Sequence, residues 1–265
     1  MVNKSAVVFE FRNATLGYGA QPVLTNLNLT ISSDSVTCLL GPNGVGKTTL
    51  FRSALGFLPP LKGEILLNGK NTARFTPKEF ARQVAYVPQA HHTPFPYKVK
   101  DVVLFGRTAH LGYFGTPNHH DRKVAESTLE MLELRHLSER PFPQLSGGER
   151  QMVLIARALA QDASFLIFDE PTSNLDYGNQ CRVLQKIRSL QDQSIGILMA
   201  THSPDHAFMI GTQVVILQGS SLVQCGRPQD ILTTETLHQT YGVDVLLFDA
   251  PQGDSPPRRI CTPVL

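Results

Sequence analysis

Residues 41–49 have the types and the spacing that bind phosphate. The pattern Gly41-x-x-x-x-Gly46-Lys47-Thr48 is that of a phosphate-binding loop, whose glycines let successive backbone N–H groups point at phosphate oxygens. Lys47 supplies a positive charge for the β- and γ-phosphates, and Thr48 offers a hydroxyl to Mg²⁺. The residues expected to contact a nucleotide here are Gly41, Asn43, Gly44, Gly46, Lys47, Thr48 and Thr49.

A pair of carboxylates follows the apolar run at residues 165–168. Asp169 and Glu170 come directly after four apolar residues, which indicate a central buried strand. In open α/β sheets, ligands bind at the carboxyl ends of the strands. We therefore expect Asp169 to hold Mg²⁺, directly or through water, and Glu170 to orient or deprotonate an attacking water molecule.

A second anion-binding helix start is expected at Ser146-Gly147-Gly148. Serine is a good N-cap residue, and the two glycines leave backbone amides exposed at the helix start. The apolar spacing of Met152, Ile155 and Leu159 predicts that an amphipathic helix follows. An ordinary helix cap is the alternative, but it leaves the glycine pair unexplained.

Strands and helices alternate around these residues. Strands are predicted at residues 7–11, 23–31, 35–40, 165–168, 195–200 and 214–217, and helices at 47–55, 121–134, after 148, and at 180–190. Such alternation predicts an α/β fold with a mostly parallel sheet. We expect one domain over residues 1–250, with a helical subdomain at about 90–160 inserted in the α/β core. A loosely packed tail with four prolines is expected to follow, at residues 251–265.

The composition excludes several classes of protein. The 265 residues are 42% hydrophobic, which is too many for a disordered chain and enough to build a core. A net charge of +2 gives no basic surface for nucleic acid, and no apolar run approaches the ~20 residues of a membrane-spanning helix. The four cysteines lie far apart, which favours reduced thiols, with Cys38 in the core.

The segment Leu145-Ser146-Gly147-Gly148-Glu149 resembles the LSGGQ signature of the ATP-binding subunit of an ATP-binding cassette (ABC) transporter, with Glu149 in place of the usual glutamine. The resemblance covers nearly the whole chain and keeps the family's motif order. It implies a P-loop ABC cassette with an N-terminal antiparallel β subdomain and an inserted helical subdomain. The further matching positions are Tyr18, residues 41–49, Gln89, residues 165–170, residues 173–176 and His202.

The resemblance implies a role for each of these residues in an ATPase that uses ATP and Mg²⁺. Tyr18 stacks on the adenine, and Gln89 belongs to both the metal site and the catalytic group. His202 hydrogen-bonds the γ-phosphate, and Asp176 lies at the nucleotide. Outside this context, Tyr18 could be a turn aromatic, and Gln89 and His202 could be surface or structural residues.

The resemblance also implies partners. Gly46 and Ser146 open two different anion-binding helices, and in this family two copies pack head to tail so that each ATP lies between Lys47 of one copy and Ser146 of the other. Such a homodimer drives separate transmembrane permease subunits, themselves a dimer, from the cytoplasmic face of the cell membrane. A periplasmic or extracellular substrate-binding protein takes part indirectly, and no nucleic acid is expected.

Segments near the signature resemble one branch of the family. Residues 99–112, 131–140 and 226–232 are similar to importers of iron–siderophore complexes, haem, cobalamin and molybdate or tungstate, and residues 201–207 lean toward the molybdate-like branch. The expected function is therefore uptake of a metal chelate or metal oxyanion. A soluble non-transport ABC ATPase, an exporter cassette and a nonhydrolysing regulator are the alternatives.

Two further groups of residues have open interpretations. The aromatic residues Phe95, Tyr97, Phe105, Tyr113 and Phe114 could form a docking surface for a membrane subunit, or several of them could belong to the core. The pairs His91-His92 and His119-His120 have no acidic or cysteine partner at ligand spacing, so solvated loop residues are favoured over a metal site.

Overall fold

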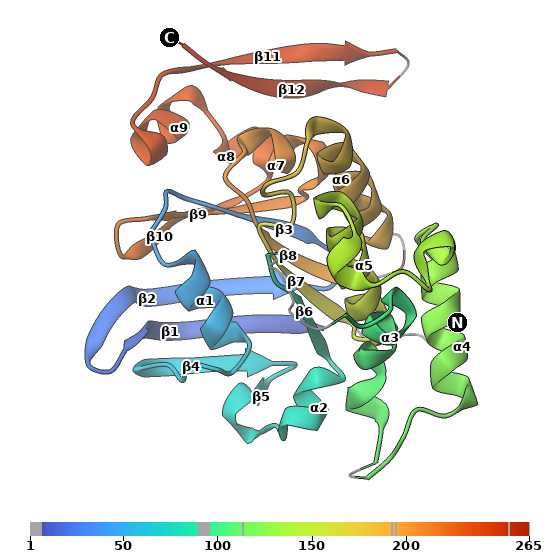
Figure 1. Cartoon of the computed structure of the whole chain (residues 1–265). Coiled ribbons are helices and arrows are strands. Elements are labelled where there is room, and N and C mark those ends of the chain that lie inside the picture. Colours follow the sequence, from blue (N-terminus) through green and yellow to red (C-terminus); the bar gives the residue numbers. More distant parts are fainter. Residues whose placement is uncertain are drawn as a thin grey trace. The chain divides into compact units, whose positions relative to one another are not determined.

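The computed structural model describes residues 7–89, 96–112, 114–191, 193, 195–253 and 255–264, with residues 222, 223, 252, 255 and 256 described by their backbone alone. The chain divides into two compact units. The first unit consists of Met1–Arg74 and Gly196–Leu265, and the second of Phe75–Ile195. Strands and helices alternate within the chain (Figure 1), which confirms the predicted α/β class.

An antiparallel sheet begins the first unit. Its strand order is β2-β1-β4-β5, formed by β1 (Val8–Tyr18), β2 (Gln21–Ser32), β4 (Lys62–Leu67) and β5 (Lys70–Asn71). The alternating apolar residues of β1 and β2 are buried on one face, as period-two patterning requires. The first strand is longer than the sequence predicts, because β-bulges after Phe11 let the pairing with β2 continue to Tyr18.

Parallel strands form the buried centre of the first unit. β3 (Val36–Leu40) pairs in parallel with β8 (Gly196–Ala200) on one side and β9 (Gln213–Gln218) on the other. All five residues of β3 and of β8 are buried, which explains their mostly apolar composition. Cys38 lies in this core, as predicted, and burial raises the pKa of its thiol to about 12. The remaining elements are β10 (Ser221–Gly226), α1 (Lys47–Ala54), η1 (Thr72–Arg74) and α7 (Pro204–Ile210).

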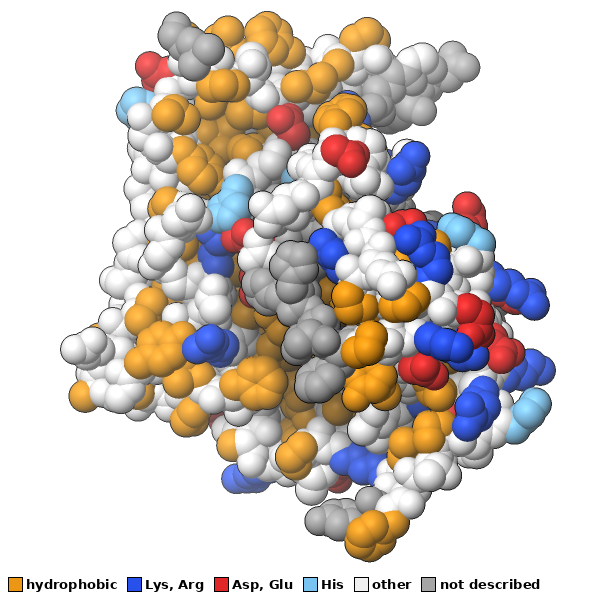
Figure 2. Space-filling view, in the orientation of Figure 1, with side chains coloured by type: hydrophobic (Ala, Val, Ile, Leu, Met, Phe, Trp, Pro, Cys, Tyr) orange, Lys and Arg blue, Asp and Glu red, His pale blue; other side chains and the backbone are white. Residues whose placement is uncertain are grey.

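The C-terminal segment of the first unit is ordered secondary structure, where the sequence predicts a loosely packed tail. After α8 (Pro228–Ile231) and α9 (Thr234–Tyr241), the strands β11 (Val245–Gln252) and β12 (Ser255–Pro263) pair as an antiparallel hairpin. Proline lacks a backbone N–H and so argues against a strand, but a two-stranded hairpin tolerates it where that N–H would face outward. Hydrophobic side chains gather over this hairpin, at the top of Figure 2.

The second unit combines two parallel strands with packed helices. β6 (Val84–Val87) pairs with β7 (Phe165–Asp169), and α3 (Val99–Leu104), α4 (His119–Met131) and α5 (Gly147–Ala160) pack against one another. α4 ends three residues before its predicted end, because Glu133 takes a left-handed conformation with φ of 60°. The remaining elements are α2 (Pro77–Ala81), η2 (Phe105–His110), η3 (Arg135–Leu137), η4 (Phe142–Gln144) and α6 (Tyr177–Gln191).

Among the described residues, no helix is both long enough and apolar enough to cross a lipid bilayer.

Candidate functional site

The phosphate-loop sequence lies between a buried strand and a helix in the first unit. β3 ends at Leu40 and α1 begins at Lys47. Gly41 has a φ of 150°, and an added Cβ would lie 2.6 Å from the carbonyl oxygen of Leu217, so a side chain does not fit there. Gly46 precedes α1 in a left-handed conformation and offers it no side-chain cap. The first turn of this helix follows the loop directly, so its N-terminal end is placed as a phosphate site needs.

Lys47 lies over its own loop. The side chain is buried, and its Nζ donates hydrogen bonds to the carbonyl oxygens of Gly41 at 2.6 Å and Pro42 at 3.1 Å. Thr48 is exposed at the helix start, whereas Thr49 is buried. The Thr48 hydroxyl is therefore placed to reach a bound ion, and Lys47 brings its charge to the loop that would enclose the phosphates.

The loop that carries His202 emerges at the same sheet edge as the phosphate loop. β3 and β8 run in parallel with Leu39 opposite Ala200, so residues 41–46 and residues 201–203 leave the sheet at adjacent carboxyl ends. The Thr201 N–H also donates to the carbonyl oxygen of Leu39 at 3.1 Å. His202 itself is exposed. The structure thus brings together two site residues that are far apart in sequence.

Side chains on either side of His202 fix this loop. The Thr201 hydroxyl lies 2.7 Å from Nδ1 of His206, and the Ser203 N–H donates to the Thr201 Oγ1 at 3.2 Å. Burial lowers the pKa of His206, and Asp205 acts in the opposite direction. The Nδ1 atom of a neutral His206 ring can accept a hydrogen bond from the Thr201 hydroxyl, which closes the loop.

Tyr18 is the last residue of β1 and is 44% exposed, so its ring face is open to a planar base. The sequence places this residue in a turn between two strands. The turn instead follows it at Gly19 and Ala20.

In the second unit, Gln89 and the two carboxylates also leave neighbouring strands. β6 and β7 are parallel with Val87 opposite Phe168, so Gln89 and Asp169 emerge at the same edge of this pair. The Tyr86 hydroxyl donates a hydrogen bond to Oδ2 of Asp169 at 3.0 Å. The amide oxygen of Gln89 and the carboxylate of Asp169 are hard ligands of the kind that Mg²⁺ binds.

Glu170 has an unusual backbone conformation for its residue type. Its φ is 48°, in the left-handed region that non-glycine residues rarely adopt. The Ser173 hydroxyl donates to Oε2 of Glu170 at 3.1 Å, and the Ser173 N–H donates to the Glu170 carbonyl oxygen at 3.1 Å. Backbone strain of this kind concentrates at functional sites, and here it aims a half-buried carboxylate from the end of a strand.

Ser146 is the N-cap of α5, as predicted, and Glu149 completes a capping box. The Ser146 N–H donates to Oε2 of Glu149 at 2.7 Å, and the Glu149 N–H donates to the Ser146 Oγ at 3.3 Å. The hydrogen bond from the Ser146 N–H is the main cause of the lowered pKa of the Glu149 carboxyl group. The glutamate in place of the usual glutamine thus stabilises the start of the signature helix.

Asp176 lies near the signature through a third residue. It accepts hydrogen bonds from the backbone N–H of Asn179 at 2.9 Å and from its side-chain amide at 2.7 Å. A Cβ on Gly148 would lie 2.5 to 2.8 Å from the side-chain atoms of Asn179. The absence of a side chain at Gly148 therefore lets α5 approach the Asp176–Asn179 pair closely.

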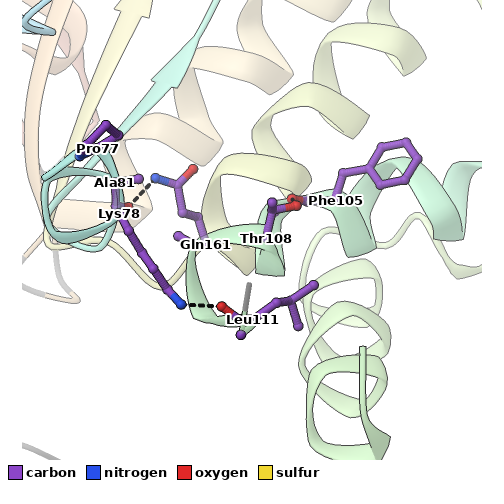
Figure 3. Close-up of a pocket in the computed structure, with 10 residues that line it drawn as sticks. Pro77, Lys78, Ala81, Phe105, Thr108, Leu111 and Gln161 are labelled. Atoms are coloured by element: carbon purple, nitrogen blue, oxygen red, sulfur yellow. Dashed lines mark hydrogen bonds between the residues drawn. The ribbon is translucent and has the colours of Figure 1, made fainter. Parts of the chain in front are cut away.

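A pocket of about 520 Å³ lies between α2 and η2 in the second unit (Figure 3). Lys78 donates to the carbonyl oxygen of Leu111, Arg82 donates to Ala109 at 3.1 Å, and the Gln161 side chain donates to Val84 at 2.9 Å. These bonds tie the walls together. The lining residues are Pro77, Lys78, Ala81, Phe105, Gly106, Thr108, Ala109, Leu111, Gly112 and Gln161.

The structure resolves part of the question about the aromatic residues. Phe105, at the pocket, is 48% exposed and makes an edge-on contact with Tyr97, which is 46% exposed, at a ring separation of 5.1 Å. Phe114 is 94% exposed. These three residues are therefore surface rather than core, while Phe95 and Tyr113 lie outside the described residues.

The histidine pairs add no metal cluster in the part of the chain that the structure describes. No group of three or more His, Cys, Asp or Glu side chains there could hold a metal ion. His119 and His120 are exposed in the first turn of α4, and His91 and His92 lie outside the described residues.

Sequence reasoning missed the hydrogen bonds that orient the site residues. Tyr86, Ser173, Asn179 and His206 each hydrogen-bond a predicted site residue or the loop that carries it. Asn179 had a local signal, because Asp176 stands three residues before it at a helix start. Tyr86 had no local sequence signal, because its hydrogen bond to Asp169 joins two residues that are brought together by strand pairing.

Comparison with known proteins shows which proteins this chain resembles. A family model described as "ABC transporter" matches residues 24–173. The chain is 33% identical to the iron(3+)-hydroxamate import ATP-binding protein FhuC of Bacillus subtilis, covering 91% of this chain and 90% of that protein. It is 37% identical to the molybdate import ATP-binding protein MolC of Haemophilus influenzae, covering 80% of this chain and 78% of that protein.

A solved structure gives the same result at the level of the fold. A putative metal-chelate type ABC transporter in an inward-facing conformation aligns with a TM-score of 0.86 and 32% identity, over 98% of this chain and 98% of that chain. The phosphate loop, the strand-end carboxylates and the helix-capping serine described above all fall within residues 24–173, which the family model matches.

Proposed function

The chain belongs to the family of ABC transporter ATP-binding subunits and is an ATPase, and from this premise we propose that it powers uptake of a metal chelate or a metal oxyanion through separate membrane permease subunits. The cargo class covers iron complexes, cobalamin, and molybdate or tungstate. Relatives named for import of iron-hydroxamate and of molybdate support this class over the alternatives of an exporter cassette and a soluble non-transport ATPase.

In this proposal the first unit binds the nucleotide. The amides of residues 41–46 and Lys47 hold the phosphates, and Tyr18 stacks on the adenine. His202, at the neighbouring strand end, hydrogen-bonds the γ-phosphate. Asn43 and Gly44 are exposed in the loop, as contacts to a bound nucleotide require.

The second unit supplies the hydrolytic groups. Gln89 and Asp169 offer amide and carboxylate oxygens, a donor pair that fits Mg²⁺. Bound there, Mg²⁺ would neutralise phosphate charge. Glu170 orients the attacking water molecule and accepts its proton, and the Ser173 hydroxyl keeps that carboxylate in place.

The proposal includes a dimer of two copies of this chain. Two helix starts, at Gly46 in the first unit and at Ser146 in the second, can each bind an anion. In the proposed dimer, Ser146, Gly147 and Gly148 of one copy meet the ATP held by Lys47 of the other, and Asp176 lies beside them through Asn179. ATP binding would close this dimer and hydrolysis would loosen it.

The closing and loosening of the dimer must reach the membrane subunits through a surface of this chain. We place that contact at the pocket between α2 and η2, together with the exposed rings of Tyr97 and Phe105. The occupant is a helical segment of a permease subunit on the cytoplasmic side of the cell membrane. The hydrogen bonds that tie the walls of this pocket together support a role in transmitting a displacement.

The observation that carries the proposal is the placement of a constrained carboxylate at a strand end beside Asp169, in a chain with a complete phosphate loop. Glu170→Gln tests it. The variant should keep ATP affinity, lose hydrolysis by at least about 100-fold and accumulate as an ATP-bound dimer. Phosphate release and light scattering measure these effects, and unchanged hydrolysis would reject the role of Glu170.

A further inference from the structure

The C-terminal hairpin lies beside the loop that carries His202. β12 packs against α7, which begins two residues after His202, and α9 packs against β9 and β11 (Figure 1). The hairpin is also fixed at a second place, because Arg259 in β12 donates to the carbonyl oxygen of Gln229 in α8 at 3.2 Å. A segment that the sequence presents as a tail is therefore part of the first unit.

One hydrogen bond joins β12 to α7 directly. The backbone N–H of Cys261 donates to Oδ1 of Asp205 at 2.8 Å, in a half-buried position. A two-stranded hairpin has outward N–H groups that need partners, and the Asp205 carboxylate satisfies one of them. A charged acceptor makes this bond stronger than one between neutral groups.

Asp205 lies within the short segment that sets the position of His202. The Thr201 hydroxyl is 2.7 Å from Nδ1 of His206, and the His206 N–H donates to the carbonyl oxygen of Ser203 at 3.2 Å. These bonds close residues 201–206 into one compact turn. A displacement of Asp205 would therefore move the turn, and His202 with it.

The same C-terminal segment reaches the phosphate loop. Tyr241, the last residue of α9, has a buried hydroxyl beside the backbone of Gly41 and near Cys261. Burial raises the pKa of Tyr241 to about 12, the Gly41 amide opposes this, and Cys261 adds to it. Cys261 thus lies near Tyr241, whose hydroxyl is beside Gly41, and has a hydrogen-bond partner in the turn of His202.

We propose that Asp205 is a positioning residue for His202, and that β12 holds it through the Cys261 amide so that the C-terminal hairpin sets the rate of ATP hydrolysis. This inference rests on the role proposed above for His202. It predicts a loss of kcat rather than of ATP affinity, because the phosphate loop keeps its own contacts when the turn of His202 moves.

The experiment compares Asp205→Ala with Asp205→Asn in steady-state hydrolysis of ATP. The alanine variant should lose about tenfold in kcat, with KM within about twofold, because it loses the acceptor for the Cys261 amide. The asparagine variant keeps a side-chain carbonyl at that place and should keep a kcat within about twofold of the original chain. An asparagine variant as slow as the alanine variant would overturn the proposal.

A control and a double variant separate positioning from loss of folding. Asp230→Ala removes a matched acidic residue from the first turn of another short helix, α8, and should leave hydrolysis unchanged. In a His202→Ala background, measured by single turnover, Asp205→Ala should cause no further loss, because it acts through His202. A further tenfold loss there, or an unchanged kcat in Asp205→Ala alone, would overturn the inference. Unchanged hydrolysis in His202→Ala alone would instead overturn the role proposed for His202.

Discussion

At the scale of single residues, the site depends on side chains whose neighbours fix them. Glu170 is held by Ser173 and by a left-handed backbone, and Asp169 accepts a hydrogen bond from Tyr86. Asp176 is likewise held by Asn179. Each of these residues would otherwise be a mobile carboxylate at the end of a strand or the start of a helix. Hydrogen bonds from neutral donors keep the three carboxylates aimed.

Glu149 provides a pH-dependent test at this scale. Its pKa is lowered in the folded chain, so its contribution to stability is complete above the pKa of the unfolded chain and is lost as the pH falls through the folded value. Glu149→Gln keeps the side-chain shape but removes the charge. At pH 7 the variant should be less stable by about 0.5 to 1 kcal/mol, the usual contribution of a helix-start charge and cap.

Urea unfolding of the original chain and of Glu149→Gln at a series of pH values measures this difference in stability. The difference in the free energy of unfolding should shrink as the pH falls from 6 toward about 4, where the carboxyl group becomes protonated in the unfolded chain. A difference that stays constant over this range would contradict the role of the Glu149 charge.

The residue types in the phosphate loop were predictable, and the residues that orient the acidic groups were not. Gly41, Lys47 and Thr48 follow one another locally, so the strand, loop and helix that their pattern demands can be inferred from the sequence. Tyr86 reaches Asp169 across a pair of strands, and no local pattern encodes that contact.

At the scale of elements, a buried ion pair holds together the helices that carry the signature. Arg107 in η2 donates to Oδ1 of Asp121 in α4 at 3.1 Å and to the carbonyl oxygen of Ala160 in α5 at 2.9 Å. Both charged side chains are about 5% exposed. Asp121 also accepts the Asn118 N–H, which is the main cause that lowers its pKa. These contacts fix α5, and so Ser146, relative to the other helices of its unit.

Removal of Asp121, the acidic partner of this pair, should lower the free energy of unfolding substantially. Asp121→Ala leaves the Arg107 guanidinium buried without its carboxylate, and should lower the free energy of unfolding by about 3 to 5 kcal/mol in urea denaturation. The matched control is Glu130→Ala, also in α4, which breaks the exposed pair with Arg135 and should cost less than about 1 kcal/mol. Equal losses in the two variants would contradict the structural role of the buried pair.

Helices were easier to predict than the C-terminal hairpin. α4 and α5 have apolar residues at helical spacing and capping residues at their starts, so their positions follow from local chemistry. The hairpin has prolines at residues 251, 256, 257 and 263, which indicate irregular structure. Its strands form because they pair with each other and lie on α7 and α9, and those contacts have no local signal.

At the scale of the whole molecule, movement at the ATP site must be transmitted to a membrane partner. Ala109→Glu places a charge in the pocket between α2 and η2. Because an unpaired charge is costly to bury in an interface, transport should fall by at least about tenfold while ATP hydrolysis by the isolated chain stays within about twofold. Ser127→Glu, on the exposed face of α4, is the matched control and should leave both unchanged. Equal transport in the two variants would move the permease contact elsewhere.

ATP-driven metal uptake can be measured as metal accumulation in living cells. Cells that lack this chain are supplied with the original chain or with Glu170→Gln, and their iron, cobalt, molybdenum and tungsten contents are measured by mass spectrometry at limiting external supply. We expect the original chain to restore the content of one of these metals and Glu170→Gln not to restore it. Equal metal contents with both chains, or a higher content with Glu170→Gln, would contradict ATP-driven uptake.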